Sequence, residues 1–215
     1  MTMKACFLLF LALVITLPGA AADRADDPLQ SPTLVLCLRP LRLAESPGLP
    51  EAVESVKRLT TFSQSQKGMA KRAVDALVYI FTDFFKKEAE LTAAEKGLAL
   101  AERQALAKEQ LATRTETVGS PLSGPNSRLA VIYRKEAADI RGKASQRLEA
   151  ALKMMKEKIT AYNVSVGYFQ SQGSTEVVIA LASSLYAVVD RHLPGYDFNP
   201  TVSREWIEEQ KRIQV

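Results

Sequence analysis

Histidine and cysteine are scarce in this 215-residue chain, and their scarcity removes several classes of function. His192 is the one histidine, and Cys6 and Cys37 are the two cysteines. Zinc sites and catalytic Cys–His or Ser–His sets need such side chains in combination. The sequence shows neither metal-ligand spacing nor a glycine-rich nucleotide loop. It therefore predicts a non-enzymatic protein with no catalytic residues, no cofactor site and no metal site.

Apolar runs long enough to cross a membrane are also missing. Two mainly apolar runs cover residues 7–17 and 177–189, which is 11 and 13 residues, whereas a spanning helix needs about 20. The first run follows Lys4 and precedes three alanines at 20–22, which is the pattern of a cleaved export signal. We expect residues 1–22 to be removed and the mature chain to be periplasmic or secreted.

Loss of the signal leaves Cys37 with no cysteine to pair with inside the chain, so packing must stabilise the exported protein. We expect a buried, inert thiol, with pairing between two chains as the alternative. The charge balance is nearly even, with 28 basic and 24 acidic residues. Aromatic residues are not interleaved with the basic ones, so we expect no nucleic-acid partner.

Proline is concentrated in one stretch. Five of the ten prolines lie between residues 23 and 50. Because proline removes a backbone donor and interrupts helices, we expect this stretch to be an extended arm. Breakers are few afterwards, and the sequence predicts a single all-α bundle domain over residues 51–215. The expected helices cover about residues 51–62, 68–115, 127–162, 174–192 and 201–213.

The first long helix carries a seven-residue repeat. Its apolar positions are Leu77, Phe84, Leu91, Leu98, Ala105 and Ala112. A second row with the same period is acidic and contains Glu88, Glu95, Glu102, Glu109 and Glu116. A full coiled coil would have apolar residues in both rows, so this helix is coiled-coil-like with one charged side. The acidic row is either a solvated face or a surface that pairs with a basic neighbour.

Such a neighbour follows the loop at residues 119–125. Residues 127–162 show an apolar stripe at helical spacing that runs from Tyr133 to Tyr162. Between residues 128 and 158 nine basic side chains outnumber four acidic ones, and Arg134 and Arg141 are among the basic ones. Helices joined by a short loop lie antiparallel. We therefore expect a long antiparallel hairpin in which the acidic row lies beside the basic helix.

The third helix is expected at the centre of the bundle. Residues 177–189 are apolar or small on every side, which is typical of a helix buried in a core or placed against a membrane. We favour the buried helix and keep membrane activity as the alternative. His192 is expected to cap the C-terminus of this helix. In the short last helix, Trp206 is expected to be an anchor within the fold or at an interface.

A four-residue segment, Arg39-Pro40-Leu41-Arg42, resembles the Arg-x-Leu-Arg host-targeting motif of secreted oomycete effectors. The resemblance implies a secreted effector whose later domain is a helical bundle. In layout alone, the chain is also similar to exported helical components of bacterial secretion machinery and to periplasmic holdase chaperones.

Together these patterns predict an exported, all-helical protein that works by binding another protein. It would serve as an assembly component, a chaperone or an inhibitor of an extracytoplasmic machinery. The alternative is a secreted effector or a membrane-active helical protein, for which a membrane surface would be the partner. The oligomeric state is left open. The expected interaction surface contains Glu88, Glu95, Glu102, Glu109, Arg134, Arg141 and Trp206.

Overall fold

The computed structural model describes residues 28–118 and 124–213, and within these ranges the chain is all helical and has no strand. The expected all-α class is confirmed. The expected signal at residues 1–22 lies outside the described residues. A 3-10 turn at Pro28–Gln30 comes first. The helices that follow are α2 (Pro32–Leu43), α3 (Leu49–Ser65), α4 (Gly68–Val118), α5 (Gly124–Ser171), α6 (Thr175–His192) and α7 (Arg204–Ile213).

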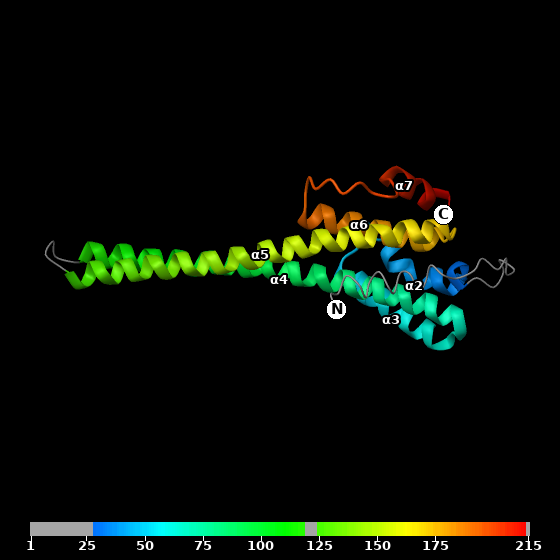
Figure 1. Ribbon diagram of the computed structural model, residues 1–215, viewed down its shortest axis with the longest axis horizontal. Helices are drawn as coiled ribbons and strands as arrows, with labels where there is room; N and C mark the ends of the chain where they lie inside the picture. The colour runs from blue at the N-terminus through cyan, green and yellow to red at the C-terminus, as the bar shows by residue number, and fades with distance from the viewer. Residues whose placement is uncertain (1–27, 119–123, 214–215) are drawn as a thin grey trace, which may run out of the picture.

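Two of these helices are far longer than the others. α4 has 51 residues and α5 has 48, and at 1.5 Å per residue each is about 75 Å long. They run antiparallel, and Figure 1 shows one half of this hairpin projecting alone, while the other helices gather around the opposite half. We call the projecting half, residues 93–118 and 124–154, the stalk, and the remainder the head. The expected long hairpin is confirmed.

The expected N-terminal extended arm is wrong for the described residues, because α2 is a helix. Pro32 lies in its first turn, where the missing N–H costs no hydrogen bond. Pro40 lies inside the helix and costs about 3 kcal/mol. Burial of one large aliphatic side chain contributes roughly 1.5–3 kcal/mol, so three of them together exceed this cost. The fully buried side chains of α2 are Leu34, Leu38 and Leu41.

The remaining helices differ from expectation mainly at their ends. α5 continues past residue 162 because Val166 and Phe169 extend its buried stripe. α7 begins at Arg204 rather than at residue 201, and the backbone of Asn199 just before it is left-handed, with φ 47°. α2 packs against both α3 and α6, so the packed head includes residues before 51.

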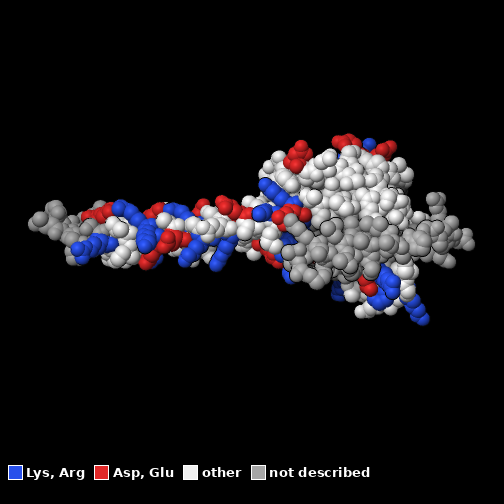
Figure 2. Space-filling view, viewed as in Figure 1, with Lys and Arg blue, Asp and Glu red and all other residues white. Residues whose placement is uncertain are grey.

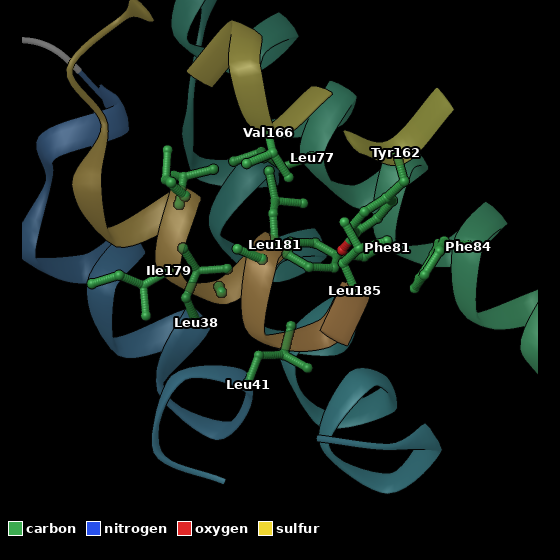
Figure 3. Packing of buried hydrophobic residues seen from close by; sticks show 14 of the residues in the cluster. Leu38, Leu41, Leu77, Phe81, Phe84, Tyr162, Val166, Ile179, Leu181 and Leu185 are labelled. Atoms are coloured by element: carbon green, nitrogen blue, oxygen red, sulfur yellow. The ribbon is translucent and has the colours of Figure 1, made fainter. Parts of the chain in front are cut away.

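Helix α6 forms the centre of the head. Every residue from 177 to 189 is buried, so the expected central helix is confirmed. Figure 3 shows side chains of α6 meeting apolar side chains of α2, α4 and α5. The labelled members are Leu38, Leu41, Leu77, Phe81, Phe84, Tyr162, Val166, Ile179, Leu181 and Leu185. Among the described helices, none is both long and apolar enough to cross a membrane.

Two smaller expectations also have an outcome in the head. Cys37 is 6% exposed, and burial raises the pKa of its thiol. Trp206 is half-buried and packs against the core, so it anchors α7 within the fold. The segment before α7 is held by Asn163, whose Oδ1 accepts from the Thr201 N–H at 2.9 Å and whose Nδ2 donates to the Asn199 carbonyl at 3.1 Å.

Candidate interaction surface

The stalk is held together by a narrow seam of small side chains. Alanine allows two helices to approach closely, but each alanine removes little apolar surface from water. A hairpin of two helices covers one stripe of each, so both of its sides remain open to solvent. The buried alanines of the seam are Ala101, Ala105 and Ala112 of α4 and Ala130 and Ala137 of α5.

One side of the stalk is lined by ion pairs, and we call it the charged flank. Glu109 binds Arg141 with both carboxylate oxygens, and one of the two contacts is 3.1 Å long. Nearer the tip, Glu116 lies 2.6 Å from Arg134. The hydrogen bond from Arg141 lowers the pKa of Glu109, and the same bond raises the pKa of Arg141. The acidic row and the basic helix therefore meet over this part of the hairpin and fix its register.

The first half of the acidic row faces the head instead. Glu88 is 1% exposed and binds the guanidinium of Arg191 at the end of α6. The ring of His192 lies between two carboxylates, with Nδ1 3.0 Å from Glu95 and Nε2 3.3 Å from Glu88. Each nitrogen of the ring therefore faces a carboxylate oxygen of α4. His192 therefore tethers the end of α6 to α4, which goes beyond the expected capping role.

Arg191 extends this group to a third segment. Its Nη2 donates to Ser46 Oγ at 3.3 Å and to the Pro47 carbonyl at 3.2 Å, in the connection between α2 and α3. We call Glu88, Glu95, Arg191 and His192 the head–stalk cluster. Its signal in the sequence is the seven-residue spacing of the two glutamates, together with an Arg-His pair at the end of the apolar helix.

The opposite side of the stalk is different, and its position is marked by another ion pair. Lys108 lies 2.7 Å from Glu136 and 5.2 Å from the centre of the Tyr133 ring. Because Lys108 and Glu109 are neighbours on α4 and lie on either side of the seam, their partners identify the two sides of α5. Figure 2 shows charges of both signs along the stalk, whereas the visible part of the head is largely uncharged.

Large apolar side chains gather on the side marked by Lys108 and Glu136, and we call it the apolar flank. Helical periodicity places residues 100 and 111 of α4 there, and residues 129, 132 and 154 of α5 face the same side. Their exposed fractions are Leu100 56%, Leu111 42%, Leu129 37%, Ile132 50% and Met154 42%. This surface was not predicted from the sequence, because the regular acidic row indicated the other side of α4.

The other expected site residues do not join one site. Glu102 is exposed on the charged flank, and Trp206 lies in the head. A small hollow between α4 and α5 is bridged by Lys158 and Asp83 at 2.5 Å. Within the described ranges, no group of three His, Cys, Asp or Glu side chains is arranged to hold a metal ion.

The four-residue segment that resembles the effector motif is part of the head. Leu41 is fully buried in the core, and Arg42 forms an ion pair with Glu176 at 2.5 Å. The side chain of Arg42 is 11% exposed. These contacts give the segment a structural role in joining α2 to α6. Comparison with protein families, with curated proteins and with solved structures finds no match for this chain.

Proposed function

We propose that this chain is an exported, non-enzymatic protein that binds another protein through its stalk. The observation that carries the proposal is the apolar flank, whose large exposed apolar side chains lie on the stalk, away from most of the helices of the head. Large exposed apolar side chains mark interaction sites in soluble proteins when they are grouped on one face. The packed head would hold the stalk at a fixed orientation, as an assembly component, a chaperone or an inhibitor requires.

The alternative of a membrane-active protein has less support. Its candidate segment, residues 177–189, is buried at every position inside the head. Release of this helix would expose the core of the whole head. The effector alternative also has less support, because Leu41 and Arg42 are engaged in packing and in an ion pair.

Site-specific photo-crosslinking tests the proposal. A benzophenone amino acid is placed at Leu111 on the apolar flank, and the full chain is illuminated in the native periplasmic or extracellular fluid. Leu106 is the matched control, because it is exposed on the same helix but lies beside the charged flank. A discrete protein adduct from position 111 and none from position 106 is expected. Absence of an adduct from position 111 would overturn the proposal.

A further inference from the structure

We propose that the apolar flank receives an amphipathic α-helix of a partner protein, whose apolar stripe is bordered by acidic residues. This inference rests on the proposed function and identifies the chemistry of the partner. It requires three properties of the flank: the spacing of a helix-binding seam, the length of a helix and an excess of positive charge at the border.

The spacing is present on α4. Six positions along the apolar flank follow one another at steps of four, three, four, three and four residues, and all six are exposed and uncharged. This is the spacing with which one helix of a coiled coil receives another. The small members allow a third helix to come close, and the leucines would fill the space between its side chains. The six residues are Ala93, Gly97, Leu100, Gln104, Ala107 and Leu111.

The length of the flank follows from α5. Its large exposed apolar side chains on this side are Leu129 and Ile132 near the tip and Met154 at the other end, with the cations Lys143 and Arg147 between them. This stretch corresponds to roughly 38 Å at 1.5 Å per residue, or a helix of about 25 residues. A helix of that length laid between α4 and α5 would turn the two-helix stalk into a three-helix bundle and would cover both rows.

The charges that border the flank are mainly positive. Arg147 lies on the same face of α5 as Leu129 and Met154, and Lys143 lies at the edge of that face. Both are exposed and form no ion pair with any residue in the described ranges. On the outer face of α4, Lys96 and Arg103 are also exposed and also form no ion pair with a described residue. The acidic residues of α5 on this side are Asp139, which is exposed, and Glu136, which is paired with Lys108. Acidic positions on a docked helix would pair with these cations and determine which partner binds.

The same charges disfavour a second copy of this chain as the occupant. Two stalks joined through their apolar flanks would bring Lys143 and Arg147 of one chain close to the same residues of the other. Like charges held together at an interface cost free energy. A different protein with acidic borders avoids this cost.

Two synthetic helices test the inference with the full mature chain. Each has about 28 residues with leucine and isoleucine at the seam positions. One carries glutamate at the bordering positions and the other carries lysine. Binding is followed by fluorescence anisotropy of the labelled peptide at low salt. The glutamate peptide should bind at least about tenfold more tightly than the lysine peptide.

Three variants localise the binding. L100Q/L111Q should weaken binding of the glutamate peptide about tenfold or more, whereas the matched control L106Q should change it by less than about twofold. K143E/R147E should reverse the preference between the peptides. All of these residues are exposed, so circular dichroism should show unchanged helix content.

Equal affinity for the two peptides, or no binding of the glutamate peptide at about 100 μM, would overturn the inference. It would also be overturned if the chain sediments as a dimer and L100Q/L111Q makes it a monomer, because a second copy would then cover the flank. An adduct at position 111 together with failure of the glutamate peptide would leave the proposed function standing and refute the acidic helix as its partner.

Discussion

Replacement of Glu88 tests how much the head–stalk cluster stabilises the packed head. The side chain of Glu88 is 2% exposed, and its Oε1 contacts both the guanidinium of Arg191 and the ring of His192. Glu88→Ala would leave Arg191 and His192 without their shared carboxylate, and breaking a buried ion pair costs about 3–5 kcal/mol. The side chain of Arg191 is 35% exposed, so water solvates part of the charge that is left. Oε2 of Glu88 is buried without a hydrogen-bond partner among the described residues. Burial of this atom costs free energy, which offsets part of the stabilisation that Oε1 contributes. We therefore expect a loss of about 3 kcal/mol, at the low end of that range.

Urea unfolding measures this loss. Trp206, the one tryptophan of the chain, reports on the head, and circular dichroism reports on the helices. A loss of about 3 kcal/mol lowers the Tm of a chain of this size by roughly 6–12 °C. Glu88→Gln keeps one acceptor for Arg191 and should cost about 1–2 kcal/mol. Glu102→Gln is the matched control, because it neutralises a glutamate of the same row that is exposed, and it should leave the midpoint unchanged.

A double-mutant cycle identifies the contact responsible. If Glu88 acts through His192, the double variant Glu88→Ala/His192→Ala should lose about 1–3 kcal/mol less than the sum of the single losses. Additive losses would show that the two side chains stabilise the protein independently. The reasoning would also be refuted if Glu88→Ala lost no more stability than Glu102→Gln.

Three further measurements test individual contacts in the head. Burial raises the pKa of Cys37, so its thiol should react with a disulfide reagent only in urea, and rapid reaction of the folded protein would contradict its burial. The hydrogen bond from Lys71, and then that from Ser63, lowers the pKa of Asp75. Its stabilising contribution is therefore present above the ordinary aspartate pKa and lost as the pH falls, so Asp75→Asn should reduce the difference between urea midpoints at about pH 3 and pH 7. Asn163→Ala removes two bonds to the segment before α7 and should cost about 1 kcal/mol, with easier quenching of the tryptophan by acrylamide; unchanged quenching would contradict this.

The parts of the fold that were predicted correctly depend on spacing within one helix. Leu77, Phe84 and Leu91 repeat every seven residues, and all three are buried in the structure. The uninterrupted apolar character of residues 177–189 likewise required no knowledge of the rest of the chain. Periodicity reports which face of a helix is buried, whatever covers that face.

The features that were missed depend on contacts between distant segments. The five prolines predicted an extended arm, because the free-energy cost of a proline such as Pro40 within a helix is local and visible in the sequence. The burial of α2 against α3 and α6, which exceeds that cost, is not visible there. The contact of Glu88 with His192 joins residues that are 104 positions apart. The apolar flank did have a local signal, but its members on α4 include alanine, glycine and glutamine, which are weak markers of an apolar face.

The division of the acidic row explains why the opposite flank carries the proposed interaction. α6 reaches the first half of the row, so Glu88 and Glu95 are engaged by the head, and Glu109 is engaged by Arg141 across the stalk. A partner that bound these carboxylates would first have to break their bonds within the chain, so the net gain in binding free energy would be small. The leucines and isoleucine of the apolar flank have no such internal competitor, so a partner that covers them gains the burial of their exposed surface in full.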